Sequence, residues 1–376
     1  MKKAVTLILS IVLVLTLLAS CGSAGTTSSA ASSAASSSKA SSSAASSSTA
    51  SSSAASSSSA AASSAAGTFD KKYEWHLATT YSSTDSATLA YKKFAELLSQ
   101  KTNGMVTVDI DSDGALGGEN DTIMSVSAGD LEFVGSGTGP VFLYTPEYSF
   151  LMGVFLVDTY EQWTKLWESS TLDGCRTKLA SDHNIVNVSG FGYRGYRNYT
   201  SNKKFTNASE FAAAGIKMRM NTNPNWMASW NALGCTCVTI ALGELYSSLQ
   251  NGTVDAAEGP WTQDTSYALQ EQQKYVMETK HTFEGSAIWM GKAFYDALPA
   301  DYQKAITAAS QEAMDYLDQI GPEAEKQQLQ KMLDAGCEKV EIDRDSFLTA
   351  AKPFLQKCFT DTWTGATYED VMKAIA

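Results

Sequence analysis

The sequence has little positive charge for its size. Its 376 residues include 28 Lys and Arg against 40 Asp and Glu, which gives a formal net charge of −12 at pH 7. No cluster of basic residues stands out from this acidic background, so we expect no binding to nucleic acid, whose phosphates select Lys and Arg. An acidic protein also gains no electrostatic attraction to anionic membranes.

Motifs of several enzyme classes are absent as well. The glycine-rich turn at residues 114–118 is not followed by the Gly-Lys-Ser/Thr of a phosphate loop, and no Gly-x-Ser-x-Gly nucleophile motif occurs. The three histidines, His76, His183 and His281, are far apart in the sequence and do not indicate a metal site. We therefore predict that the protein is not an enzyme, and that it has no metal and no cofactor.

The six cysteines do not indicate a metal site either. Cys235 and Cys237 are separated by one residue, a poor fit to the spacing of zinc ligands. We interpret these two and Cys175 as small core residues. Cys337 and Cys358 could form a disulfide, although nothing in the sequence demands one.

The first 20 residues have the pattern of an export signal. Lys2 and Lys3 precede an apolar stretch, residues 4–17, that is too short to span a membrane as a mature helix. The following Leu-Ala-Ser-Cys resembles the lipobox of bacterial lipoproteins, which implies cleavage before Cys21 and a lipid on that cysteine. A plain secretory signal or a single transmembrane anchor is the alternative. We expect attachment to the outer face of the bacterial cytoplasmic membrane, which is periplasmic if the cell has an outer membrane.

Residues 22–66 are almost entirely Ser and Ala. Such a tract has nothing to bury, so we predict a disordered tether. We assign residues 1–20 to the signal peptide and residues 21–67 to the lipidated cysteine and the tether. The folded body then begins at residue 68, and its length of some 300 residues suits two lobes.

Strand and helix patterns alternate along this body. Residues 73–79 and 105–110 alternate with period two, whereas the segment between them has apolar residues at helical spacing. The same succession restarts at residue 216, which favours an α/β fold. Further strands are expected at residues 131–135, 184–189, 237–240, 254–258, 275–283 and 287–290. Further helices are expected at residues 159–181, 224–233, 242–250, 299–334 and 346–359.

Ligands of open α/β sheets bind beyond the carboxyl ends of the strands. Two loops at such ends, residues 79–84 and 135–140, are therefore predicted to point at one crevice. They offer Thr80, Ser136 and Thr138 as candidate ligand contacts. Glu119, which follows the glycine-rich turn, is a fourth candidate.

The strand at residues 216–220 carries an unusual pair of cations. Ile216, Met218 and Met220 lie on one face, and Lys217 and Arg219 on the other. A guanidinium on a rigid strand is always charged, and its planar fork of donors matches a carboxylate. We hypothesise that Arg219 anchors an anion in a cleft. An ordinary ion-paired arginine is the alternative.

A glycine, aromatic and arginine run at residues 190–197 indicates where the chain first crosses between lobes. We assign residues 68–194 to lobe I, with a return segment at about 284–320. Residues 195–283 form lobe II, with the C-terminal helices at about 321–376.

Several short motifs resemble those of the DctP-type solute-binding proteins of TRAP transporters, and they occur in the same order along the chain. They lie at residues 94–96, 101–104, 114–118, 195–197, 215–219, 233–234, 244–255, 258, 280–281 and 298–304. The resemblance covers nearly the whole folded body. It implies a two-lobed periplasmic-binding-protein fold that closes by a hinge on a small organic acid.

The resemblance also implies roles for individual residues. Arg219 would form the salt bridge to the ligand carboxylate, and Arg197 would add a second contact at the lobe boundary. Arg194 is the local competitor for that second role. Glu258 is expected to position one of these arginines rather than to touch an anion.

One departure from the family concerns residues 255–260. The family usually has Asp-Gly-Gln-Glu-Asn-Pro there, whereas this chain has Gly259 in place of the asparagine that helps to bind the ligand. This leaves room for a bulkier ligand, or for Trp261 to line the pocket. Core packing is the alternative for Trp261 and for three further candidate wall residues, Trp226, Trp230 and Tyr246.

The resemblance therefore implies a monomeric extracytoplasmic protein that captures an organic acid and delivers it to TRAP membrane subunits. Import in this family is driven by an ion gradient, so no ATPase is expected. A sensory protein that presents its ligand to a signalling receptor is one alternative. A binding protein for ABC-type import is another.

Overall fold

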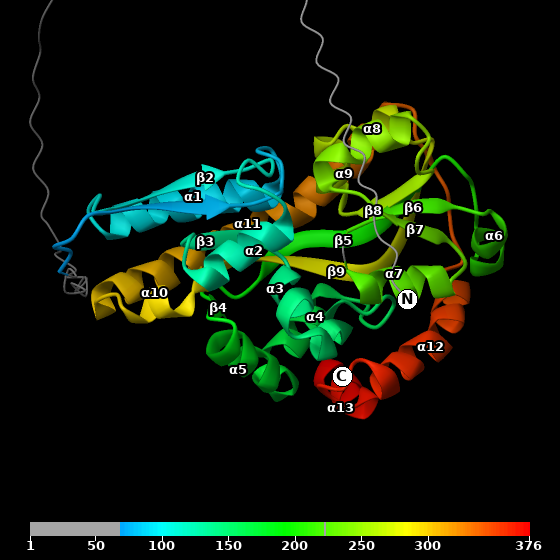
Figure 1. Cartoon of the computed structure of the whole chain (residues 1–376). Coiled ribbons are helices and arrows are strands. Elements are labelled where there is room, and N and C mark those ends of the chain that lie inside the picture. Colours follow the sequence, from blue (N-terminus) through cyan, green and yellow to red (C-terminus); the bar gives the residue numbers. More distant parts are fainter. Residues whose placement is uncertain (1–67, 222) are drawn as a thin grey trace, which may run out of the picture. The chain divides into compact units, whose positions relative to one another are not determined.

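A computed structural model describes residues 68–221 and 223–376 of the chain (Figure 1). The predicted signal peptide, Cys21 and the Ser/Ala tract lie outside these residues. Within the described part, no helix is long and apolar enough to cross a membrane.

Ten strands of the described part join in one mixed sheet, in the order β2-β1-β3-β9-β5-β8-β6-β7, and β4 and β10 pair with β9. A first strand group pairs in parallel and consists of β1 (Tyr73–Ala78), β2 (Val106–Asp111) and β3 (Phe133–Ser136). A second parallel group consists of β6 (Lys217–Met220), β7 (Thr236–Thr239) and β8 (Ala256–Gly259). The fold is therefore α/β, as the alternating patterns predict.

Two long antiparallel strands, β5 (Gly192–Ser201) and β9 (Tyr275–Gly291), connect the groups (Figure 1). β9 pairs with β3 at one end and runs along β5, which in turn pairs with β8. The sequence predicts two strands with a break at residues 284–286. The break is wrong, because β5 supplies ladder partners there: Gly195 pairs with Glu284, and Gly192 pairs with Ser286.

Helices surround this sheet, and their bounds differ in part from the predicted ones. The predicted helix at residues 159–181 ends early, because Ser169 is extended with ψ of 157°. The helical segments are α1 (Ser86–Lys101), α2 (Glu119–Ala128), α3 (Gly139–Tyr144), η1 (Pro146–Met152), α4 (Tyr160–Glu168), η2 (Ser170–Leu172), α5 (Asp173–Asp182), α6 (Ala208–Ala213), α7 (Pro224–Ala232), η3 (Leu242–Glu244), α8 (Leu245–Gln250), α9 (Trp261–Ser266), η4 (Leu269–Glu271), α10 (Lys292–Asp296), α11 (Ala300–Asp334), α12 (Arg344–Asp361) and α13 (Tyr368–Ile375). The two remaining short strands are β4 (Ile185–Asn187) and β10 (Glu338–Lys339).

The longest helix, α11, continues past Gly321 and Pro322 as the apolar pattern predicts. It packs against α1, β5 and α9. Glycine is required at Gly321, because a Cβ there would lie 2.3 Å from the carbonyl oxygen of Tyr193 on β5. This close approach holds the helix against the strand that links the two groups.

The described cysteines are all unpaired, so Cys337 and Cys358 do not form a disulfide. Cys175 and Cys235 are buried core residues, and Cys237 is partly buried. The sulfur atoms of Cys235 and Cys237 lie 3.7 Å apart.

Candidate ligand-binding site

A cavity of about 590 Å³ lies between the two strand groups. Its walls come largely from loops that follow the carboxyl ends of β1, β2, β3, β6 and β7, as the strand order predicts. The lining residues are Thr80, Tyr81, Asp113, Gly114, Gly117, Gly118, Glu119, Asn120, Asp121, Thr138, Gly139, Phe142, Met152, Arg197, Arg219, Asn221, Trp226, Ile240, Ala241, Leu242, Gly243, Gln263, Tyr267 and Glu284.

Arg219 is a buried cation that faces this cavity without a carboxylate partner. It lies on β6, is only 5% exposed, and its Nε donates to the carbonyl oxygen of Ile240 at 2.9 Å. Among the described residues, it forms no ion pair and no other hydrogen bond. Burial lowers the pKa of Arg219 to about 10, which still leaves it charged at neutral pH. Its terminal nitrogens are therefore available to an anion in the cavity.

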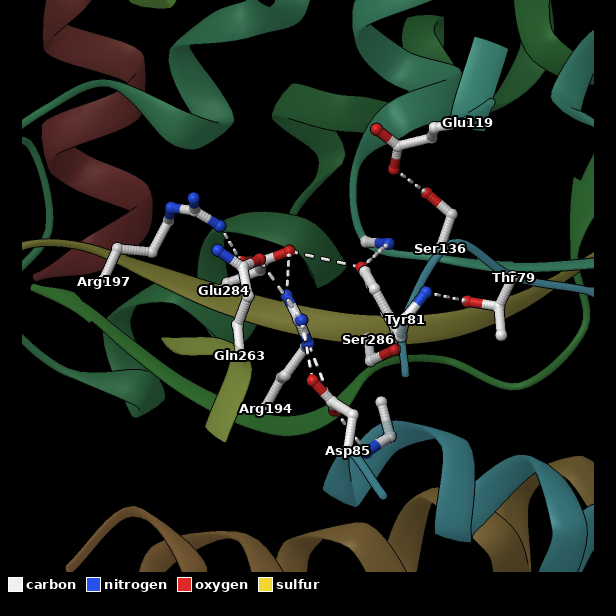
Figure 2. Close-up of polar contacts among 12 residues, drawn as sticks. Thr79, Tyr81, Asp85, Glu119, Ser136, Arg194, Arg197, Gln263, Glu284 and Ser286 are labelled. Carbon is white, nitrogen blue, oxygen red and sulfur yellow. Dashed lines mark hydrogen bonds and ion pairs between the residues drawn. The ribbon is translucent and has the colours of Figure 1, made fainter. Parts of the chain in front are cut away.

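Arg197, on β5, lines the same cavity but is fully engaged. Its Nε and Nη2 donate to the two carboxylate oxygens of Glu258 at 2.6 and 2.7 Å. Its Nη1 donates to Glu284 (Figure 2). The guanidinium carbon also lies 4.5 Å from the centre of the Trp226 ring. Such a side chain offers a face to the cavity but few free donors.

Arg194, two residues after the start of β5, is fully buried and does not line the cavity. Its Nη2 donates to Asp85 at 2.9 Å, and its Nη1 lies 2.8 Å from Glu284 (Figure 2). The guanidinium stacks on Tyr81 with 3.6 Å between its carbon and the ring centre. Since Asp85 caps the N-terminus of α1, this arginine joins the first strand group to the crossing strand.

Opposite charges stabilise each other in this network. Burial favours the neutral form of Glu258, but Arg197 and His281 outweigh burial and lower the pKa of Glu258 to about 2. His281 is itself fully buried, and its Nε2 lies 3.1 Å from Glu258. Burial lowers the pKa of His281, so its ring is neutral at pH 7. His281 therefore has a structural contact, and within the described residues no cluster of three or more metal-ligating side chains exists.

Glu119, the first residue of α2, is one of three acids of the cavity lining, with Asp113 and Asp121, that form no ion pair among the described residues. Its Oε1 accepts a hydrogen bond from the Ser136 hydroxyl at 2.7 Å (Figure 2), and no described Lys or Arg forms an ion pair with it. Burial raises the pKa of Glu119. Ser136 lies behind this carboxylate and is not a lining residue.

Asp264, on α9, is a third acid with a shifted pKa, after Glu258 and Glu119. It is fully buried, and among the described residues neither of its carboxylate oxygens has a hydrogen-bond partner. Burial raises the pKa of Asp264 to about 8, and the negative charge of Glu258 adds to that effect. Its side chain is therefore mostly protonated at pH 7.

The other predicted site residues divide into two sets. Thr80, Thr138 and Trp226 line the cavity. Trp261 does not, because it begins α9 and packs in a separate apolar cluster with Val276 and Met332. The remaining predicted residues that lie outside the lining set are Glu258, Gly259, Trp230 and Tyr246.

The backbone at Gly259 lies against the amide of a nearby side chain. A Cβ at Gly259 would lie only 2.4 Å from the Nε2 of Gln263. Gln263 lines the cavity, and its Nε2 is buried without a hydrogen-bond partner in the described part of the chain. The glycine therefore makes room for a longer polar side chain.

Several lining residues have no signal in the sequence patterns, among them Phe142, Gln263 and Tyr267. The last two belong to α9 and its C-terminal end, a six-residue helix too short to show a period. The hydroxyl of Tyr267 donates to the carbonyl oxygen of Thr80 at 2.8 Å, which joins the two sides of the cavity. Of these two residues, only Thr80 was predicted from the sequence to lie at the cavity, because it follows a predicted strand.

Comparison with known proteins gives a consistent result. The model of the family described as bacterial extracellular solute-binding protein, family 7, matches residues 77–362. The 2,3-diketo-L-gulonate-binding periplasmic protein YiaO of Escherichia coli is 27% identical over 296 residues, which cover 78% of this chain and 88% of that protein. The C4-dicarboxylate-binding periplasmic protein DctP of Rhodobacter capsulatus is 28% identical over 249 residues, which cover 65% of this chain and 72% of that protein.

Solved structures share the fold. A TRAP periplasmic solute-binding protein of Roseobacter denitrificans with bound L-galactonate superposes with a TM-score of 0.74 at 24% identity, over 81% of this chain and 99% of that one. A TRAP periplasmic solute-binding protein of Shewanella oneidensis with bound succinate gives 0.74 at 23% identity, over 81% and 98%.

Proposed function

Because the chain belongs to the bacterial extracellular solute-binding proteins of family 7, we propose that it captures a carboxylate-bearing organic acid outside the cytoplasmic membrane and delivers it to a TRAP transporter. Arg219 is the observation that carries this proposal. A buried guanidinium without a partner costs free energy, and the anion that completes it recovers that cost. The cavity that Arg219 faces lies between both strand groups, which supports an anion site there.

Binding would proceed by closure of the two sides around the solute. The ligand carboxylate takes the free nitrogens of Arg219 on β6, while residues from the first strand group, such as Thr80 and Thr138, contact the rest of the molecule. A ligand that touches both sides stabilises the closed arrangement more than the open one. The bond from Tyr267 to Thr80 would form in the closed state and break on opening.

We place the hinge where the lobe boundaries of residues 194/195, 283/284 and 320/321 meet. Gly195 pairs with Glu284 across β5 and β9, and the ladder is irregular between Tyr193 and Gly195. Gly195 adopts a φ of +141°, which favours glycine. Gly321 contacts Tyr193 at the same place. The chain would therefore cross between the lobes three times at one place. This supports one lobe made of residues 68–194 and 284–320, and a second lobe made of residues 195–283 and 321–376.

We further propose that Cys21 carries a lipid that attaches the protein to the outer face of the cytoplasmic membrane. The Leu-Ala-Ser-Cys motif that ends at Cys21 supports this proposal. Replacing Cys21 by Ser should release the protein into the extracellular or periplasmic fraction of the producing cell. Equal membrane retention of both forms after a carbonate wash would contradict the lipid anchor.

The carboxylate site is tested by calorimetry on the purified protein with a panel of mono- and dicarboxylic acids. Arg219→Ala should abolish or strongly weaken every binding event that the wild type shows, and Arg219→Lys should retain part of it. Arg176→Ala is the control, because Arg176 lies on α5, pairs with Asp173 and is remote from the cavity lining. Unchanged affinity in both Arg219 variants would overturn the role of Arg219. The absence of any acid that binds the wild type would overturn the proposed function.

A further inference from the structure

The geometry of the cavity points to a ligand with one carboxylate and a hydroxylated far end, and it assigns to Glu119 the exclusion of dicarboxylates. This inference rests on the proposed function and names the substrate class of the same site. The solved structures that share the fold hold both kinds of acid, such as galactonate and succinate, so the fold does not decide between them.

The arginines of the crossing strand already have anionic partners before a ligand enters. Arg194 and Arg197 are matched by Asp85, Glu258 and Glu284 through the ion pairs of the crossing strands. Of the described arginines that line the cavity, Arg219 is therefore the one left for a ligand. A dicarboxylate would bring two negative charges to a site with one available cation.

Glu119 makes the second negative charge more costly still. Glu119 comes from α2, which lies between β2 and β3 of the first strand group in the chain. Arg219 comes from β6 of the second strand group, so the two residues line the cavity from different sides. The Ser136 hydroxyl holds one oxygen of Glu119, and a Cβ at Gly139 would lie 3.0 Å from that same oxygen. This hydrogen bond orients the carboxylate at the wall of the cavity. Glu119 repels a carboxylate, but it accepts hydrogen bonds from hydroxyl groups.

Neutral hydrogen-bonding groups complete the lining. Thr80, Thr138, Asn221 and Tyr267 supply hydroxyl and amide groups from both sides. Gln263 also contributes to this lining. Such a lining suits a chain of hydroxyl groups better than a short apolar diacid.

Two pairs of acids test the inference, because the members of each pair differ only at the far carbon. Galactonate and threonate end in a hydroxymethyl group, and galactarate and tartrate carry a second carboxylate there. Calorimetry on the wild type should show binding of at least one monoacid, with its diacid weaker by roughly 100-fold or more, since like charges placed together cost several kcal/mol. In Glu119→Gln, which keeps the shape and removes the charge, the diacid should gain roughly 10-fold or more.

The control is Asp130→Asn, which removes one exposed negative charge just beyond the C-terminus of α2 and outside the cavity lining. It should leave the ratio of the two affinities unchanged. Glu119→Ala serves as a second variant, with thermal unfolding as the check that both variants fold.

The inference is overturned if a diacid binds the wild type as tightly as its monoacid, or if both Glu119 variants keep the wild-type ratio. It is also overturned if 6-aminohexanoate, which has an ammonium at the far end and no hydroxyl groups, binds more tightly than either monoacid. The proposed function fails in a different way. In that case neither member of either pair binds, or Arg219→Ala binds with the affinity of the wild type.

Discussion

Arg197 and Arg219 are buried to nearly the same extent, 4% and 5% exposed, yet their surroundings differ completely. Arg197 on β5 is held by two carboxylates, whereas Arg219 on β6 has one hydrogen bond to a backbone carbonyl. The crossing strands therefore neutralise their charges internally, and the cavity wall does not. The difference separates an arginine that is held by ion pairs within the fold from one whose terminal nitrogens have no partner among the described residues.

The largest effect should come from removing the paired arginine. Arg197→Ala leaves Glu258 and Glu284 buried with one cation fewer, and breaking a buried pair in this way costs about 3–5 kcal/mol. We expect a loss of this size in the free energy of unfolding, measured by urea denaturation without ligand. A loss below about 1 kcal/mol would remove the distinction between the two arginines.

The unpaired arginine should behave in the opposite way. Arg219→Ala should lower ligand affinity by roughly 100-fold, since hydrogen bonds to a charged group contribute about 1.5–3 kcal/mol. It should leave the ligand-free protein as stable as the wild type or more stable, because a buried unpaired charge is removed. Calorimetry and urea denaturation of the same preparation measure both quantities. A large loss of ligand-free stability would show that Arg219 is structural.

Asp264 extends the comparison to an acid that is neutralised by a proton instead of a partner. Its pKa of about 8 in the folded protein lies above its usual value of 3.8, so between about pH 4 and 8 the folded state binds a proton that the unfolded state does not. Stability from this group is therefore present at low pH and is lost as the pH rises toward 8. The expected slope approaches about 1.4 kcal/mol per pH unit.

Asp264→Asn should remove that slope. Urea denaturation of both proteins at pH 5, 6 and 7 isolates it, because the other titrating groups are shared. Glu258 acts in a separate window with the opposite sign: its pKa of about 2 makes its stabilisation complete above about pH 4.5 and lost as the pH falls toward 2. Parallel pH curves for the wild type and Asp264→Asn would contradict the neutral state of Asp264.

The smallest effect concerns the contact across the cavity. Tyr267→Phe removes the hydroxyl that donates to Thr80 and should weaken ligand binding about 2- to 10-fold, the worth of one neutral hydrogen bond. Tyr246→Phe is the matched control, because its hydroxyl also donates to a single acceptor, Glu271, but lies outside the cavity. Equal losses in the two variants would assign the effect to general stability.

Sequence patterns predicted those features that depend on neighbours in the chain. Period-two alternation placed β1, β2 and β6, and with β6 the face that carries Arg219. Helical spacing predicted the whole of α11 through Gly321 and Pro322, although proline usually ends a helix. Close packing against β5 overrides that preference.

Sequence patterns could not predict the features that depend on residues far apart in the chain. The partners of Arg197 are 61 and 87 residues away, so the sequence pattern alone did not separate a ligand contact from an ion pair. Trp261 follows Pro260, where the chain turns from β8 into α9, and this turn directs the indole into an apolar cluster away from the cavity. The predicted helix at residues 159–181 failed for a similar reason: the Arg176 side chain donates to the carbonyl oxygens of Trp167 and Ser169, which favours a helix end there.

The continuous course of α11 has a mechanical consequence. A helix of 35 residues that contacts α1 on one side of the proposed hinge and α9 on the other would have to bend as the lobes separate there. Pro322 lacks an N–H group, so the helix is weakest beside the hinge, but every other turn resists curvature. The elastic cost of bending therefore grows with the opening angle. In the proposed closure, the stiffness of this one helix would limit the aperture of the cleft, and thereby the size of the solutes that enter it.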